Sequence, residues 1–327
     1  MAGGHRPPWP TTTMGAVSGQ VLRVAVTGGA GFIGTHTVRL LLEHGHQVLV
    51  VDDLRHACGQ PVPDGVPLVT EDMASPAARQ ALVDFHPHAI IHFAAQGGVS
   101  RSLRDPASDA LNNVVGAVAV MRAAVDAGCS RMVFASSGGA IYGRARRLPS
   151  RETDRAQPLA PYGAAKLAGE AYLGMFERTF GLSYVALRYG NVYGPYQDGT
   201  GEAGMVAISC QRLVAGEPPQ ITGDGGQTRD FVYVGDVARA NLLALTAAYR
   251  GPVNIGTGTP TSISQVATSL ARLAGFTTPP LLVAGRPGEV RSNFLDPSRA
   301  GRQLGWSAKV SLEEGLDLTL KSFQHPV

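Results

Sequence analysis

Lysine is almost missing from this 327-residue chain, which has three lysines among its 28 basic residues. Charged residues make up 16% of the chain, and the formal net charge is only +3. A nucleic-acid-binding protein usually carries a basic stripe or arm, and none is visible here. One group of arginines lies in a stretch flanked by glycine and proline, which predicts a solvated loop: Arg144, Arg146, Arg147 and Arg151. We therefore expect no nucleic-acid partner.

Cysteine is also scarce. The three cysteines, Cys58, Cys129 and Cys210, are an odd number, form no CxxC motif and have no neighbouring pair of histidines. This pattern supports neither a disulfide scaffold nor a zinc site, so we expect no bound metal. It is typical of a protein from a reducing compartment, and we expect a cytoplasmic location.

Long hydrophobic runs are absent too. The most apolar stretch, residues 114–128, is interrupted by Arg122 and Asp126, and no run reaches the 18 residues typical of a membrane span. The first residues lack the continuous apolar segment of a signal peptide, and residues 1–20 are expected to form a disordered tail. We therefore expect a soluble protein without a membrane partner.

Short β-branched runs alternate with amphipathic stretches over the first 190 residues. Strands are expected at 21–27, 47–51, 66–70, 88–93, 131–136 and 184–188. Helices are expected at 32–44, 75–85, 106–127 and 162–180. Such alternation predicts an α/β fold, a doubly wound parallel (Rossmann) sheet over residues 21–190, with ligands at the edge where the strands end.

Turn-rich segments separate the helices of the second half. These helices are expected at 205–215, 236–248, 263–273, 297–304 and 311–322. The pattern predicts that residues 191–327 form a smaller α+β lobe for the substrate. A strand at 252–255, within a return segment of about 231–256, is expected to rejoin the main sheet.

A glycine-rich turn lies between the first strand and the first helix. Its glycines at 28, 31 and 34 form a GxxGxxG pattern, which allows the backbone and the helix N-terminus to approach a pyrophosphate. The residues expected to bind the dinucleotide here are Gly28, Gly31, Phe32, Ile33 and Gly34.

The second strand ends in Asp52-Asp53, where a carboxylate can accept hydrogen bonds from the adenosine ribose. Such a carboxylate repels a 2′-phosphate, so NAD is favoured over NADP, although Arg55 nearby leaves NADP open. Asp72 and Met73 follow the next strand; they either contact the adenine or are only the residues that precede a helix.

Tyr162 and Lys166 are four residues apart at the start of a helix, a spacing that places both side chains on one face. The pKa of a free tyrosine is about 10, and a nearby cation favours the phenolate. With three lysines and nine tyrosines in the chain, fewer than one such pair is expected by chance. Ser137 follows the strand at 131–136 and can contact the same reacting oxygen. These three residues predict an acid–base site.

At this point the chain resembles the extended short-chain dehydrogenase/reductase superfamily, and within it the UDP-glucose 4-epimerase-like nucleotide-sugar enzymes. The resemblance spans residues 21–323. It rests on TGGAGFIG (27–34), HFAAQ (92–96), SSGGAIYG (136–143), PYGAAK (161–166), LRYGNVYGP (187–195), GDGGQTRDFVYVGD (223–236), NIGTG (254–258), RPGE (286–289) and LGWSAKVSLEEGL (304–316).

The resemblance implies residue roles. It makes Ser137, Tyr162 and Lys166 the catalytic residues, and Phe93, Ala94 and Ala95 part of the cofactor site. Asn113 matches an asparagine that helps to order the active site, and it is expected to belong to the cofactor site. Asn191 matches a residue that holds the sugar-nucleotide phosphate, while Arg229 and Arg286 match arginines that clamp the pyrophosphate.

The resemblance also implies a reaction, NAD-dependent epimerisation at C4 of a UDP-sugar through a 4-keto intermediate. Related dehydratases carry an acid shortly after the catalytic hydroxyl, where this chain has Gly138, Gly139 and Ala140. Tyr196, after YGP, favours a neutral sugar over a uronate. Asn293 matches a substrate-size gate and is small enough to admit an N-acetyl group.

Alternatives to epimerisation stay open from the sequence. They are a 4,6-dehydratase, a 4-ketoreductase or a uronate epimerase on the same scaffold, or a non-catalytic NAD-sensing protein. The resemblance further implies a homodimer, paired through the helices at 106–127 and 162–180.

Overall fold

The computed structural model describes residues 20–200, 204–285 and 290–325. The tail predicted for residues 1–20 therefore falls outside the described residues, except for Gln20. Within the described ranges, no helix is long and apolar enough to cross a membrane.

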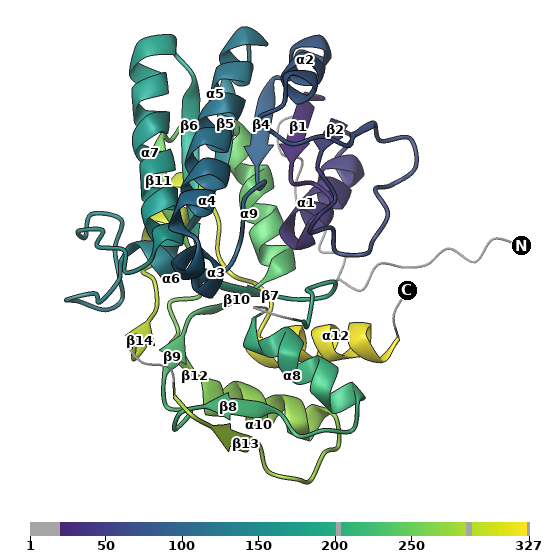
Figure 1. Cartoon of the computed structure of the whole chain (residues 1–327), viewed down its shortest axis with the longest axis vertical. Coiled ribbons are helices and arrows are strands. Elements are labelled where there is room, and N and C mark those ends of the chain that lie inside the picture. Colours follow the sequence, from purple (N-terminus) through teal and green to yellow (C-terminus); the bar gives the residue numbers. More distant parts are fainter. Residues whose placement is uncertain (1–19, 201–203, 286–289, 326–327) are drawn as a thin grey trace, which may run out of the picture.

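A seven-stranded parallel sheet forms the centre of the molecule, in the order β11-β6-β5-β4-β1-β2-β3 (Figure 1). Its strands are β1 (Arg23–Thr27), β2 (Gln47–Val51), β3 (Leu68–Val69), β4 (Ala89–His92), β5 (Arg131–Ser137), β6 (Ser183–Tyr189) and β11 (Gly251–Ile255). The doubly wound α/β fold predicted from the sequence is confirmed. The segment predicted as a strand at 66–70 is shorter than expected.

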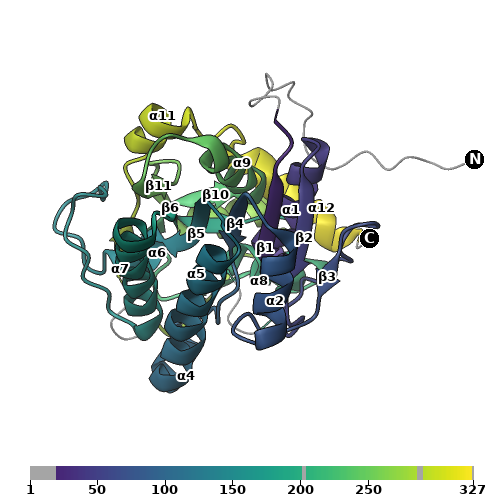
Figure 2. The same ribbon diagram turned by 90° about the horizontal axis from the view of Figure 1, so that it is seen from above.

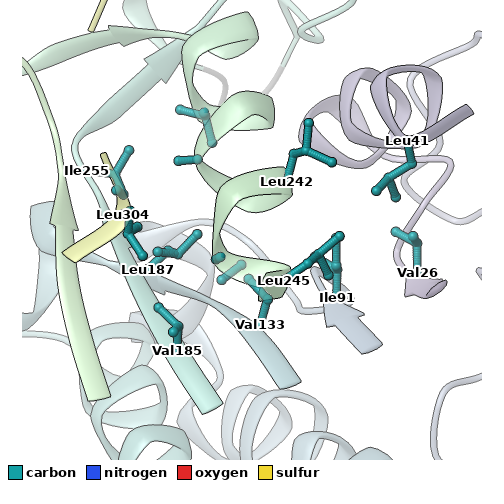
Figure 3. Close-up of a cluster of buried hydrophobic side chains, with 14 of the residues drawn as sticks. Val26, Leu41, Ile91, Val133, Val185, Leu187, Leu242, Leu245, Ile255 and Leu304 are labelled. Atoms are coloured by element: carbon teal, nitrogen blue, oxygen red, sulfur yellow. The ribbon is translucent and has the colours of Figure 1, made fainter. Parts of the chain in front are cut away.

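Helices cover both faces of the sheet (Figure 2). One face carries α2 (Pro76–Phe85), α5 (Gly116–Asp126) and α7 (Pro161–Phe180); the other carries α1 (Phe32–Glu43), α9 (Val234–Thr246) and α11 (Ser298–Leu304). Because side chains alternate along a strand, neighbouring residues enter different cores: Ile90 packs under α2 and α5, and Ile91 under α9. Figure 3 shows the second core, where Leu242 and Leu245 of α9 lie over the sheet.

The helix predicted at 106–127 consists of three consecutive segments. They are α4 (Pro106–Ala110), a π-helical turn η1 (Leu111–Val115) and α5. Pro106 occupies the first turn of α4, and the Asp105 side chain accepts a hydrogen bond from the Ser108 amide at its N-terminus. Wide turns of this kind often occur at functional sites. A short helix, α3 (Val99–Arg104), precedes them and was not predicted.

A smaller lobe lies below the carboxyl edge of the sheet in Figure 1. Its core lies between α8 (Met205–Val214), α10 (Ile263–Leu273) and α12 (Leu312–Gln324). Its short strands are β7 (Asn191–Tyr193), β8 (Gln220–Thr222), β9 (Thr228–Arg229), β10 (Phe231–Tyr233), β12 (Thr261–Ser262), β13 (Leu281–Val283) and β14 (Ser292–Asn293).

The chain passes from this lobe back to the main sheet. The predicted strand at 252–255 is β11, which pairs in parallel with β6. The return also includes α11, which packs on β11 and α9, so it continues beyond the segment expected at 231–256. These crossings bring residues from both halves of the chain to the same edge of the sheet.

Candidate active site

The loop between β1 and α1 brings the backbone close to the end of β4. Gly28 has a φ of 72°, a left-handed conformation that favours glycine. A Cβ atom there would lie 2.5 Å from the Ala94 amide nitrogen, and one at Gly34 would overlap the Gly28 carbonyl oxygen. No side chain caps the N-terminus of α1 with a hydrogen bond. The loop therefore presents backbone at the positive end of the helix dipole, where an anion is favoured.

A cavity of about 700 Å³ lies along the edge where the strands end. Every residue predicted to bind the cofactor lines it except Asn113: Gly28, Gly31, Phe32, Ile33, Gly34, Asp52, Asp72, Met73, Phe93, Ala94, Ala95, Tyr162 and Lys166. Other residues of the cavity wall were not predicted from the sequence, among them Gln96, Arg101 and Arg104. They lie in the loop after β4 and in the short helix α3, where no periodic pattern of apolar residues indicates a site.

Asn113 does not line the cavity but contacts Gln96, which does, and its role in the cofactor site stays a prediction. It is buried, and its Oδ1 accepts a hydrogen bond of 2.6 Å from the Gln96 amide. Its Nδ2 donates to the Gln96 carbonyl oxygen at 3.0 Å and to Asp109 Oδ1 at 2.9 Å. The side chain thus holds the loop after β4 in place.

The acidic residues after β2 and β3 are arranged around one arginine. Arg55 donates through Nε to Asp53 at 2.6 Å and through Nη2 to Asp72 at 2.9 Å. Asp52 is held separately, because its two oxygens accept hydrogen bonds from the amides of Ala30 and Leu54. Arg55 is therefore paired with two carboxylates, which disfavours a role in binding a 2′-phosphate.

The three predicted catalytic residues come together at the end of β5 and the start of α7. Ser137 is hydrogen-bonded to the phenol of Tyr162. The Lys166 side chain is buried, and its Nζ lies 5.7 Å from the centroid of the Tyr162 ring and 5.1 Å from that of Phe134. An acid–base residue, a hydroxyl and a cation thus share one corner of the site.

Burial dominates the protonation of this pair. It raises the pKa of Tyr162 to about 12, the negative charge of Asp109 adds to the rise, and the hydrogen bond with Ser137 lowers it. Burial also lowers the pKa of Lys166 to about 8. The pKa of Tyr162 is thus raised, contrary to the lowering that the sequence predicted from Lys166, and a positive charge next to the ring would favour the phenolate.

A buried ionic network supports the strand end that carries Ser137. Ser136 Oγ donates to Glu170 Oε1 at 2.6 Å. Arg188 binds both oxygens of Glu170, at 2.9 and 2.6 Å, and donates to Tyr142 Oη at 2.9 Å. The network joins β5, β6 and α7 beneath the site. The sequence analysis missed it, although Glu170, a charge one helical turn after Lys166 in an otherwise mostly apolar helix, was a usable signal.

The predicted substrate residues form a second group around the loop after Ser137. Asn293 is buried and donates through Nδ2 to the Gly139 carbonyl oxygen at 3.0 Å. Arg229 is the register partner of Asn293 in neighbouring strands, and Asn191 Oδ1 lies near Gly139. Arg286 lies outside the described residues. The three described residues lie next to the cavity but do not line it.

Asp230 holds this second group together. Its carboxylate is buried and accepts hydrogen bonds from Thr257 and from the amides of Gly258 and Leu295. Because it follows Arg229 directly, it fixes the positions of both β9 and the segment after β14.

The Tyr196 side chain packs against α1. Its ring stacks on His36 with centroids 5.3 Å apart, and the Arg39 guanidinium lies over the same ring at 5.1 Å from its centroid. Arg39 Nη1 also donates to Tyr196 Oη at 3.2 Å. These contacts fasten the loop after β7 to α1.

A comparison with protein families agrees with this geometry. Residues 24–256 match the family described as NAD dependent epimerase/dehydratase family. The chain belongs to this family.

Individual members of the family are similar over most of their length. A UDP-glucose 4-epimerase of Mycolicibacterium smegmatis is 40% identical over 93% of this chain and 99% of its own. The crystal structure of UDP-glucose 4-epimerase from Thermotoga maritima with UDP-glucose superposes with a TM-score of 0.89, at 41% identity, covering 93% of this chain and 99% of that one. The Thermus thermophilus UDP-glucose 4-epimerase in complex with NAD gives 0.88 at 41% identity, covering 94% and 100%.

The cofactor of this family is NAD, and the cavity fits it. Gly28 and Gly34 leave the backbone space that a Cβ atom would fill, which is what a pyrophosphate at a helix N-terminus requires. Asp52 lines the cavity beyond this loop, and Arg55 is neutralised by its two carboxylates. These residues of the cavity are therefore suited to NAD. Arg55 is already paired with Asp53 and Asp72, which disfavours its use in binding a 2′-phosphate.

Proposed function

We propose that this family member catalyses the NAD-dependent 4-epimerisation of a UDP-sugar, with UDP-glucose and UDP-galactose as the first pair and their N-acetylhexosamine counterparts as the second. The observation that carries the proposal is the pair Tyr162 and Lys166 at the wall of the dinucleotide cavity, with Ser137 hydrogen-bonded to Tyr162. An acid–base residue at that place can act on a hydroxyl group bound next to the cofactor.

The glycine-rich loop and Asp52 would hold the cofactor, through the N-terminus of α1 and the carboxylate at the end of β2. Bound NAD supplies the hydride acceptor and donor that a reaction at C4 requires. Its oxidised form carries a positive charge, which favours the Tyr162 phenolate that burial alone opposes.

Tyr162 then takes the proton of the sugar 4-hydroxyl through its phenolate oxygen and later returns a proton to the same oxygen. Ser137, already hydrogen-bonded to Tyr162, donates to the oxygen on which charge develops. Lys166 holds positive charge beside the ring of Tyr162. Asn191, Arg229 and Arg286 are proposed to bind the nucleotide phosphates, so that the sugar can present either face of C4.

The loop after Ser137 bears on the alternative reactions. A Cβ atom at Gly138 would lie 2.6 Å from Leu295 Cδ1, so an acidic side chain there would require the neighbouring segment to move. Gly139 and Ala140 carry no acid either. This supports epimerisation over a dehydration that uses an acid at these positions.

The proposal is tested by incubating the purified protein, without added cofactor, with UDP-galactose and in parallel with UDP-N-acetylgalactosamine. Proton NMR of the sugars is expected to show conversion of at least one to its 4-epimer, with NAD retained from purification. No conversion of either, even after NAD is added, would refute the proposal.

Asn293 is proposed to decide whether the site accepts an N-acetyl group. Replacing Asn293 with tyrosine places a ring where a small amide now lies against the loop after Ser137. The ratio of kcat/KM for UDP-N-acetylgalactosamine to that for UDP-galactose is expected to fall at least ~10-fold, since a crowded pocket discriminates by this order. Asn293→Ser, the matched small variant, should keep the ratio; an unchanged ratio in Asn293→Tyr would exclude the gate.

We further propose that two chains pair through the helices beside the site. Large apolar side chains are exposed along α3 and η1: Val99, Leu103, Leu111 and Val115, at 47%, 58%, 64% and 54%. Exposed apolar surface of this kind is typical of a protein interface. Light scattering is expected to give the mass of two chains, and Leu111→Glu to give that of one; a wild-type monomer would contradict the pairing.

A cytoplasmic location is also part of the proposal. Cys58, Cys129 and Cys210 are free thiols. A reducing compartment maintains cysteines in this state, which supports the cytoplasm.

A further inference from the structure

A carboxyl group that the proposed reaction does not use is buried behind the cavity. Asp109, on α4, has no exposed surface. Its Oδ1 accepts the hydrogen bond from Asn113, whereas its Oδ2 is buried without a hydrogen-bond partner among the described residues. The helix that carries Asp109 packs against α7, which carries Tyr162 and Lys166.

A buried carboxylate of this kind requires a positive charge nearby. Removing an ionised group from water costs several kcal/mol unless a partner compensates for it. Burial raises the pKa of the Asp109 carboxyl group, whereas the hydrogen bond from Asn113 and the charge of the buried Lys166 lower it. In return, the charge of Asp109 raises the pKa of Lys166 and that of Tyr162. The three groups therefore lie close enough to influence one another.

We propose that Asp109 is a positioning residue whose buried carboxylate serves as the counter-ion of Lys166 and keeps that lysine charged beside Tyr162. The inference rests on the proposed acid–base role of Tyr162. Without Asp109, the buried ammonium would lose the negative charge that raises its pKa, and it would release its proton more readily.

The other titratable groups around the pair keep a constant charge. His92, on β4, is buried, and its pKa is lowered to about 3, so it stays neutral. Tyr189, on β6, is buried with a pKa raised far above its ordinary value, so it also stays neutral. Arg101 and Arg104 lie on α3, which packs against α4 and α7. A change of charge near the pair can then be assigned to Asp109.

The sign of the effect is the same for both members of the pair. A negative charge favours the protonated form of Tyr162 and of Lys166, so its removal lowers the pKa of both. The reaction requires Tyr162 to be deprotonated, which sets the acid limb of the pH profile. It also requires Lys166 to be protonated, which sets the alkaline limb. Replacing Asp109 with asparagine is therefore expected to move both limbs of the pH profile of kcat/KM to lower pH, each by about one unit.

The experiment compares wild type, Asp109→Asn and Asp109→Glu. Asparagine keeps a hydrogen-bond acceptor for Asn113 but removes the charge. Glutamate keeps the charge, so both limbs of its pH profile should lie near those of the wild type. Asp105→Asn is the matched control, because it removes an exposed carboxylate from the N-terminus of the same helix, and its limbs should not move. Asp109→Ser is a second neutral variant in case Asp109→Asn does not fold.

A direct titration makes the result independent of turnover. The ultraviolet absorbance of the Tyr162 phenolate is followed as the difference between each protein and its Tyr162→Phe counterpart. The phenolate should appear at lower pH in the neutral variants. A lower rate with both limbs and the phenolate titration unchanged would show a merely structural role and overturn the inference. Absence of epimerisation in the wild type would instead refute the proposed function, while the phenolate titration would still test the charge coupling.

Discussion

Tyr162→Phe is expected to lower kcat by about 10²- to 10⁴-fold, the usual contribution of a positioned acid–base group. The phenol is the group that Ser137 contacts at the wall of the cavity, and its ring lies next to Lys166. Phenylalanine keeps the ring and removes only the oxygen that carries the proton. The measurement is the rate of conversion of the UDP-sugar identified by NMR.

Tyr172→Phe is the matched control for this loss. Tyr172 lies on the same helix, but 41% of its surface is exposed. Its kcat should stay within twofold of the wild type, and both variants should retain bound NAD. A Tyr162→Phe enzyme with nearly full turnover would exclude the acid–base role and the mechanism built on it.

Glu170→Gln is expected to destabilise the protein by about 3–5 kcal/mol, because it leaves the Arg188 guanidinium buried without its counter-ion. Glu170 and Arg188 are 8% and 6% exposed at their side chains, and two hydrogen bonds join them. For a chain of 327 residues, such a loss corresponds to a fall in Tm of roughly 4–7 °C. Calorimetry at constant pH and cofactor content measures it.

Two controls separate the buried charge from the substitution itself. Glu313→Gln removes a carboxylate from an exposed ion pair with Arg272 and should cost less than about 1 kcal/mol. The double variant Glu170→Leu with Arg188→Met removes both charges and should be more stable than Glu170→Gln. Equal Tm values for Glu170→Gln and the wild type would show that the pair is dispensable.

Loss of Glu170 should also affect the reaction. Ser136 would donate its hydrogen bond, now 2.6 Å long, to a neutral amide oxygen in place of a carboxylate, and Ser137 is the next residue. We therefore expect kcat to fall in the folded fraction of Glu170→Gln. The site thus depends on a support that lies outside its own surface.

Local patterns in the sequence were sufficient for the elements and for much of the cofactor wall. The strand at 47–51 and the helix at 263–273 were predicted with the observed bounds. Gly28 and Gly34 were identifiable because a turn before a helix admits no Cβ atom at these positions. The spacing of Tyr162 and Lys166 was identifiable because one helical turn separates them. Each of these signals lies within a few consecutive residues.

Features that depend on distant segments were missed. Asp109 and Glu170 appeared in the sequence as ordinary helical carboxylates, and only packing shows that they are buried beside Lys166 and Arg188. The packing of Tyr196 against α1 and the hydrogen bonds between Asn113 and Gln96 likewise join segments that no local pattern connects.

Local backbone and side-chain preferences were enough to predict the strands of the central sheet, most of the helices, the glycine-rich loop and the acid–base pair. The tertiary structure alone decided which charges lose contact with water. Burial, not residue type, raises the pKa of Tyr162 to about 12 and lowers that of Lys166 to about 8. Since desolvation depends on every element packed around a group, the chemical state of the site could not be predicted from the sequence.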